Sequence, residues 1–245
     1  MKKAILVVSF GTTWREARRT CIAPVEDELF AAFPDRAPAR AYTSRFIVRR
    51  LQAQGEDIPG EAEALEALRA AGCGDILVAC THMIPGEEYE RAAALAEGCR
   101  VTRPLLDAEA DLERMASLLG GVAREEGRPL VLMGHGTDHA ADGVYARLRS
   151  KLPEGVFLAC VEGSHGLAEL LPALDALPEK RVTVMPLMLV AGDHAHNDLA
   201  GDGPDSWKSV LEARGFDVRP RLQGLGALAE VRRMYVEKAR RSVDS

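Results

Sequence analysis

The chain is predicted to be an α/β protein with two similar halves, each built around a parallel sheet. Apolar runs of about five to eight residues alternate with segments of helical periodicity, as in repeated βα units. Two sequence patterns also occur twice, in the same order. The length of 245 residues allows one large α/β domain or two small ones.

The apolar runs predict six strands, and the periodic segments between them predict helices. The expected strands are 4–9, 39–43, 75–79, 130–134, 156–161 and 182–190. Apolar helical stripes contain Ile22, Val25, Leu29 and Phe33, then Leu65 and Leu68, then Leu112, Met115, Leu119 and Val122. Further helices are expected near 143–152, 166–177, 204–214 and 225–241.

The internal repeat is weak but ordered. KKAILVVSFGTTW resembles GRPLVLMGHGTDH, and DILVACTHMIPGEEYE resembles VTVMPLMLVAGDHAHND. Each pattern lies at the end of a predicted strand, which indicates two related halves that meet near residues 107–128. The matched positions are Gly11 with Gly136, Thr12 with Thr137, and Gly86 with Gly192.

Composition excludes several classes of protein. With 47% hydrophobic and 28% charged residues the chain is neither disordered nor fibrous, and a formal charge of −6 argues against a nucleic-acid partner. The apolar run 4–8 is too short for a secretory signal or a membrane span. Five scattered cysteines without a CxxC pair fit a reducing, cytoplasmic setting.

Histidines and a carboxylate follow three strands of the second half. In open parallel sheets ligands bind beyond the carboxyl ends of the strands, so His135, Glu162 and His194 are expected at one edge. Imidazole and carboxylate together suit Co, Fe, Ni or Zn. These three residues lie nearest their strand ends and are the candidate metal ligands.

The other histidines have simpler explanations. His139, His165 and His196 are expected to support the ligands or to lie on the surface. HGTDH is also compatible with a helix cap, with Thr137 or Asp138 accepting from the first free N–H groups. Glu162 could equally be a turn carboxylate.

Aromatic and basic residues follow the strands of the first half, where Phe10 and Trp14 stand in place of His135 and His139. The aromatic residues are compatible with a flat apolar ligand, although packing in the core is the commoner role of aromatic residues at strand ends. The basic residues could bind carboxylates or form a solvated helix face. No GxSxG, P-loop or GxGxxG motif occurs, and Ser9 lacks a paired base. The aromatic set is Phe10, Trp14, Tyr42, Phe46 and Tyr89, and the basic set is Arg15, Arg18, Arg19, Arg45, Arg49 and Arg50.

Six motifs carry a family resemblance along nearly the whole chain. The chain resembles the sirohydrochlorin cobaltochelatases of anaerobic cobalamin synthesis, the CbiK-type class II chelatases. The motifs are SFGT at 9–12, YTSRFI at 42–47, HMIPGEEYE at 82–90, MGHGT at 133–137, VEGSH at 161–165 and VAGDHAHND at 190–198.

The resemblance implies two Rossmann-like, three-layer halves with an active-site cleft between them. The expected halves are residues 1–122, with the C-terminal helix 225–245 packing back on them, and residues 123–224, which carry the metal site. It also implies catalytic and metal-binding roles for His135, Glu162 and His194. The residues expected to bind the substrate are Phe10, Trp14, Arg15, Ser44, Arg45, Glu88 and Tyr89.

The implied reaction inserts Co²⁺ into sirohydrochlorin without ATP and releases two pyrrole protons. A neutral imidazole can bind the metal or accept a proton, and an incomplete ligand set lets the metal leave. The alternatives are insertion of Fe²⁺ or Ni²⁺, or a metal or tetrapyrrole carrier without turnover. No membrane partner is expected, and a homo-oligomer stays possible.

Overall fold

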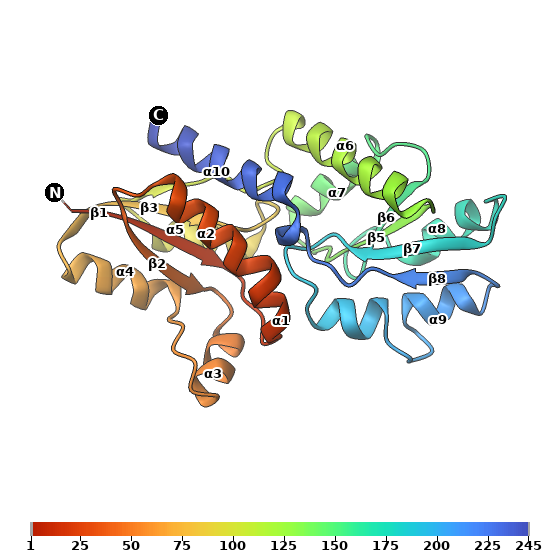
Figure 1. Cartoon of the computed structure of the whole chain (residues 1–245), viewed down its shortest axis with the longest axis horizontal. Helices are drawn as coiled ribbons and strands as arrows, with labels where there is room; N and C mark the ends of the chain where they lie inside the picture. The colour runs from red at the N-terminus through yellow and green to blue at the C-terminus, as the bar shows by residue number, and fades with distance from the viewer. Residues whose placement is uncertain (1, 245) are drawn as a thin grey trace. The chain divides into compact units, whose positions relative to one another are not determined.

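The computed structural model describes residues 2–244 and divides them into two compact units. The first unit contains residues 2–107 and 226–244, and the second contains Ala108–Leu225. Both are α/β units with a four-stranded parallel sheet (Figure 1). The predicted fold class is therefore confirmed. No helix of the described chain is both long and apolar enough to cross a membrane.

The first sheet has the strand order β2-β1-β3-β4. Its central strand β1 is buried on both faces, which explains its uninterrupted apolar sequence. Helices α4 and α5 cover one face, while α2 and α10 pack on the other (Figure 1). The strands are β1 (Lys2–Ser9), β2 (Ala37–Tyr42), β3 (Cys73–Cys80) and β4 (Arg100–Val101). The helices are α1 (Arg15–Ala17), η1 (Arg18–Ile22), α2 (Ala23–Ala32), α3 (Arg45–Ala53), α4 (Glu61–Ala70), α5 (Glu87–Leu95), η4 (Leu225–Ala227, spanning the boundary) and α10 (Ala229–Asp244).

The second sheet repeats this topology with the order β6-β5-β7-β8. Helices α8 and α9 pack on one face of the sheet through Leu170, Leu174, Trp207 and Leu211. Helices α6 and α7 lie against β5 and β6. The strands are β5 (Leu130–Gly134), β6 (Val156–Cys160), β7 (Arg181–Pro186) and β8 (Asp217–Pro220). The helices are α6 (Glu109–Glu126), η2 (Ala140–Asp142), α7 (Gly143–Arg149), α8 (Leu167–Asp175), η3 (Ala195–Leu199) and α9 (Trp207–Glu212).

Two details differ from the sequence expectations. All six expected strands form, but β7 ends at Pro186 and not at Val190. Leu187 N–H still donates to the Met133 carbonyl of β5 at 2.7 Å, and the chain bends at residues 188–190. The short edge strands β4 and β8 were not expected, since two and four residues leave little alternating pattern.

The boundary between the units also differs from the expected position between residues 122 and 123. It lies between residues 107 and 108, because the whole of α6 belongs to the second unit. Buried Leu112, Met115 and Leu119 line this helix, and it contacts β5, β6 and α7. The C-terminal helix α10 packs on α2 and β3 of the first unit, where Tyr235 Oη donates to the Thr81 carbonyl at 2.7 Å.

Candidate functional site

Two loops of the second unit meet at the carboxyl ends of β5 and β6. Glu162 N–H donates to the His135 carbonyl at 2.8 Å, so these two residues are adjacent across the loops. Gly136 makes this approach possible: its φ is +77°, and a Cβ there would lie 1.8 Å from the Glu162 carbonyl oxygen. The glycine of the MGHGT motif thus brings His135 and Glu162 together.

The His135 ring is oriented by the loop backbone. Its Nδ1 lies 2.9 Å from the Gly136 carbonyl oxygen, which can only accept, so in the neutral ring Nδ1 carries the hydrogen. Nε2 therefore keeps its lone pair. Glu162 Oε2 lies 3.8 Å from the same Nδ1.

His194 is oriented in a related way by a side chain. It occupies the N-cap position of the π-helical turn η3, one turn before Asp198. Its Nδ1 lies 2.6 Å from Asp198 Oδ2, an acceptor that holds the hydrogen on Nδ1 and leaves Nε2 as the lone-pair nitrogen. A carboxylate behind an imidazole is the usual arrangement for a metal-binding histidine.

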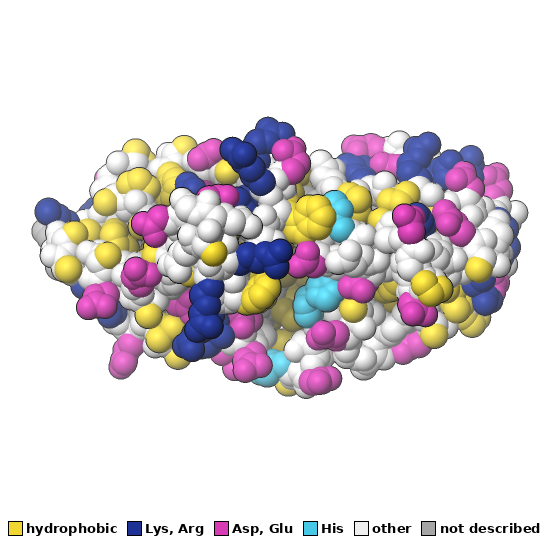
Figure 2. Space-filling model, turned by 90° about the horizontal axis from the view of Figure 1, so that it is seen from below, with side chains coloured by type: hydrophobic (Ala, Val, Ile, Leu, Met, Phe, Trp, Pro, Cys, Tyr) yellow, Lys and Arg dark blue, Asp and Glu magenta, His cyan; other side chains and the backbone are white. Residues whose placement is uncertain are grey.

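The structure brings the two imidazoles together. The rings of His135 and His194 lie edge to face, with centroids 4.8 Å apart and planes at 85°. Both side chains are exposed to solvent, at 48% and 36%, and Figure 2 shows histidine side chains at the surface. Within residues 2–244, however, no three His, Cys, Asp or Glu side chains form a group that could hold a metal ion. The metal-binding role of the three residues stays a prediction.

The remaining histidines of the second unit make local contacts. His139 Nδ1 accepts from Ala141 N–H at 3.1 Å and so caps η2, a role that was predicted for Thr137 or Asp138. His165 Nδ1 lies 3.4 Å from Glu169 Oε2, and His196 lies within η3. Burial raises the pKa of the nearby Cys160 thiol to about 12.

Several residues expected to bind substrate lie on the surface of the first unit. Phe10 and Trp14 are 50% and 38% exposed. Ser44 N–H donates to the Phe10 carbonyl at 3.3 Å, which joins the ends of β1 and β2, and Ser44 Oγ caps α3. Arg15 and Arg45 are exposed at the starts of α1 and α3 and form no ion pair with any described residue.

Other members of these sets are engaged elsewhere. Tyr89 is only 9% exposed and belongs to the core cluster of the first sheet, a packing position. Glu88 is paired with Arg91 at 2.8 Å. Among the arginines, Arg18 is buried and bonded to Glu56, and Arg19 is paired with Glu16, so neither offers a free fork for a ligand carboxylate.

Comparison with known proteins agrees with the motifs. Residues 3–244 match the family model of the cobalt chelatases (CbiK). The chain belongs to this family. This cobalt chelatase is 39% identical to the sirohydrochlorin cobaltochelatase of Salmonella typhimurium over 96% of the chain and 94% of the relative. It is 34% identical to sirohydrochlorin cobaltochelatase CbiKC of Nitratidesulfovibrio vulgaris over 91% and 84%.

Solved structures share the fold of this cobalt chelatase. SirB from Bacillus subtilis with Fe³⁺ aligns with a TM-score of 0.63 at 16% identity, covering 99% of this chain and 96% of that one. The sirohydrochlorin chelatase SirB from B. subtilis subspecies spizizenii in complex with cobalt aligns with a TM-score of 0.56 at 17% identity, over 100% and 96%. At this level of identity the likeness concerns the fold alone.

Sequence analysis of the chelatase missed two residues that the structure makes prominent. Asp198 supports His194, and its i,i+4 spacing in the sequence could have indicated this had the segment been recognised as helical. His82 follows β3 with both ring nitrogens buried and without a hydrogen-bond partner. Burial, together with the charge of Arg91, lowers the pKa of His82 to about 4.

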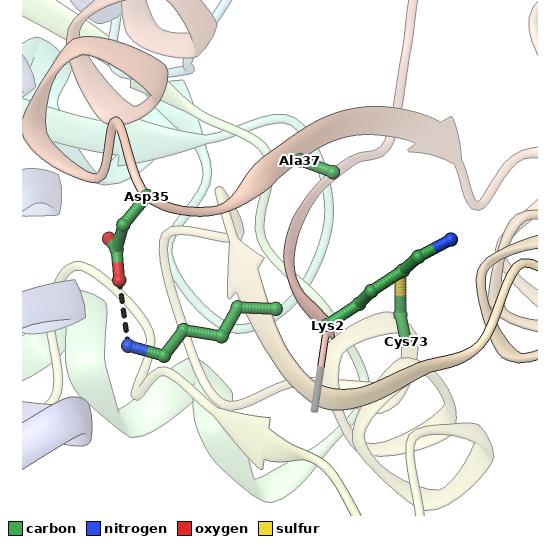
Figure 3. A pocket seen from close by; sticks show the side chains of 5 residues that line it. Lys2, Asp35, Ala37 and Cys73 are labelled. Atoms are coloured by element: carbon green, nitrogen blue, oxygen red, sulfur yellow. Dashed lines mark hydrogen bonds and ion pairs between the residues drawn. The ribbon is translucent and has the colours of Figure 1, made fainter.

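A hollow at the opposite edge of the first sheet is not a candidate site. Lys2, Lys3, Asp35, Ala37 and Cys73 line it at the amino ends of the strands (Figure 3). Both lysines are engaged: Lys2 Nζ donates to the Ala71 carbonyl at 3.0 Å, and Lys3 Nζ pairs with Asp35 at 2.8 Å. Lys3 is therefore neutralised by Asp35, and the Lys2 ammonium is held by a backbone carbonyl.

Proposed function

We propose that the protein inserts Co²⁺ into sirohydrochlorin, without ATP, through His135, Glu162 and His194. The observation that carries the proposal is the pair of adjacent imidazoles, whose Nδ1 atoms are both held by acceptors. Each ring can then offer Nε2 to a metal or to a proton. Membership of the cobalt chelatase family supports the choice of metal, and the relatives named above support the choice of tetrapyrrole.

The same residues suit both parts of the reaction, the delivery of the metal and the removal of the pyrrole protons. Two imidazoles and one carboxylate would give an incomplete ligand set, which can pass Co²⁺ on to the four nitrogens of the tetrapyrrole. The two pyrrole protons need acceptors, and a neutral imidazole can serve once its metal has left. Glu162 lies beside one of these imidazoles, with Oε2 3.8 Å from His135 Nδ1.

The first unit supplies groups suited to a flat, polycarboxylate substrate. Phe10 and Phe46 expose 50% and 65% of their surface, and large apolar residues this exposed often mark binding surfaces. Arg15, Arg45 and Arg49 lie in the same segments and form no ion pair within the described chain. Unpaired guanidinium groups bind carboxylates through bidentate hydrogen bonds.

The test is a visible-absorbance assay of the purified protein with sirohydrochlorin and Co²⁺, with no nucleotide added. We expect conversion to continue past one equivalent of substrate per chain. Parallel assays with Fe²⁺ and Ni²⁺ measure the metal preference, because this donor set accepts all three ions. A spectral change that stops at one equivalent would instead identify a carrier, and no change with Co²⁺ would refute the proposal.

A further inference from the structure

Asp142 joins the two loops that carry His135 and Glu162. It ends the short helix η2, and its carboxylate accepts hydrogen bonds from both loops. Oδ1 lies 3.2 Å from Thr137 N, while Oδ2 lies 3.2 Å from Ser164 N and 2.6 Å from Ser164 Oγ. One side chain therefore connects two segments that are far apart in the sequence.

The two loops have matching geometry around this carboxylate. Thr137 stands two residues after His135, and Ser164 stands two residues after Glu162. A glycine with positive φ separates each pair, Gly136 at +77° and Gly163 at +79°. These HGT and EGS segments thus direct backbone N–H groups toward one acceptor, as successive amides in such turns do.

The approach of Asp142 leaves no room for a side chain at Gly163. A Cβ at this glycine would lie 2.6 Å from Asp142 Oδ1 and 3.0 Å from the Thr137 carbonyl oxygen. Burial acts to raise the pKa of Asp142, but the hydrogen bonds from Ser164 and Thr137 outweigh it and hold the pKa below its usual value. The group is an ionised carboxylate, which only accepts hydrogen bonds, and it suits these three donors.

We infer that Asp142 is a positioning residue, which fixes the distance between the metal-binding atoms of His135 and Glu162. The inference rests on the proposed function, since it assigns those two residues to one metal. Asp142 itself contacts neither His135 nor Glu162 through a hydrogen bond or ion pair within the described chain; it acts on the backbone two residues beyond each. Groups that orient metal ligands typically contribute about 10- to 100-fold in metal affinity.

The experiment is a Co²⁺ titration of the purified protein without tetrapyrrole, followed by the absorbance of the bound ion. Asp142→Ala is expected to weaken Co²⁺ binding by about tenfold or more. Ser164→Ala, which removes only the 2.6 Å hydroxyl contact, is expected to weaken it by a smaller factor. Ser164→Ala also provides the test if Asp142→Ala fails to fold.

Asp175→Ala is the matched control. This carboxylate also joins two loops of the second unit, by accepting from Lys180 before β7 and Arg214 before β8, at the opposite edge of the sheet. It should leave Co²⁺ affinity within about twofold of the wild type. Equal losses in Asp142→Ala and Asp175→Ala, or unchanged affinity in the Asp142 and Ser164 variants, would overturn the inference.

The outcome is separable from that of the proposed function. If the wild type binds Co²⁺ but does not insert it, the proposed function fails while the affinity ratio still tests Asp142. If the wild type inserts Co²⁺ and Asp142→Ala binds it normally, the inference alone fails. A wild type that binds no Co²⁺ would overturn both.

Discussion

The two units share a scaffold and differ in the chemistry that it carries. Both have the same strand order, and the turn that follows β1 in the first unit has the same geometry as the turn that follows β5 in the second. Gly11 and Gly136 have φ values of +93° and +77°, and the threonine that follows each accepts from a backbone N–H two residues later. The weak sequence repeat therefore corresponds to a repeated local structure.

Backbone hydrogen bonds identify the equivalent positions. Ser44 N–H donates to the Phe10 carbonyl as Glu162 N–H donates to that of His135, which pairs Phe10 with His135 and Ser44 with Glu162. The carbonyls of His82 and Met188 accept from Leu105 and Leu225, respectively. His82 and Met188 are therefore the third pair of equivalent positions. Six residues further along the chain from each, Glu88 corresponds to His194.

The comparison teaches that the scaffold fixes positions and leaves their chemistry free. Phe10, Ser44 and Glu88 in the first unit stand where the second unit has two imidazoles and a carboxylate. Unpaired arginines in the first unit suit an anionic ligand, and the carboxylates beside the histidines of the second unit suit a cation. The same strand ends thus carry groups suited to an anion in one unit and to a cation in the other.

The largest difference in activity between the two units should appear when side chains at equivalent positions are replaced by alanine. His135→Ala and His194→Ala are expected to lower the rate of cobalt insertion by about 10²- to 10⁴-fold, as for a positioned acid–base group. Phe10→Ala should act mainly on the KM for sirohydrochlorin. Steady-state kinetics with His165→Ala as control would measure this, and equal losses in all four variants would contradict the assignment.

His82 of the first unit, whose ring nitrogens are buried, should make stability depend on pH. The unfolded His82 ring takes up a proton below about pH 6.5, whereas the folded ring stays neutral down to a pKa of about 4. Falling pH therefore favours the unfolded state, by about 2–3 kcal/mol between pH 7 and pH 4.5. Urea unfolding at the two pH values should show a smaller loss in His82→Phe than in the wild type.

A His82→Phe variant that loses as much stability as the wild type at pH 4.5 would show that His82 does not carry the effect.

The equivalent glycines should tolerate alanine to different extents. Positive φ costs either substitution about 1–2 kcal/mol. A Cβ at Gly136 would also meet the backbone oxygen of Glu162 at 1.8 Å, whereas at Gly11 it would meet the side-chain ring of Tyr42 at 2.5 Å. Thermal unfolding should show Gly136→Ala to be less stable than Gly11→Ala by at least about 1 kcal/mol, and the reverse order would break the comparison.

The smallest effect concerns the cationic surface of the first unit. Arg45→Gln and Arg49→Gln should each raise the KM for sirohydrochlorin a few-fold and change kcat little, because such contacts exist in ground and transition states alike. Added salt should weaken binding in the wild type as well. Arg19→Gln is the control, since Arg19 already pairs with Glu16, and a pure kcat effect at Arg45 would contradict this role.

Most of the fold could be predicted from the sequence, because buried parallel strands leave uninterrupted apolar runs such as Ala4–Val8. The unit boundary could not, because the apolar stripe of α6 does not say which sheet it covers. Its contacts with β5 and β6 decide that.

In the site, His135, Glu162 and His194 could be predicted to lie at one edge of a sheet, because each follows the end of a strand. It could not reveal the carboxylates that orient them. Asp142 reaches its partners through side-chain contacts across 22 residues of sequence, and the π-helical turn that aligns His194 with Asp198 has no apolar period to recognise.

The return of α10 to the first unit has a consequence for biosynthesis. Residues 108–225 form the second unit from one continuous stretch, whereas the first unit lacks a helix until residues 226–244 have been made. Tyr235 then bonds to Thr81, and Arg232 to Glu28 at 2.5 Å. The first unit, although it begins the chain, therefore stays incomplete until the last residues have been made.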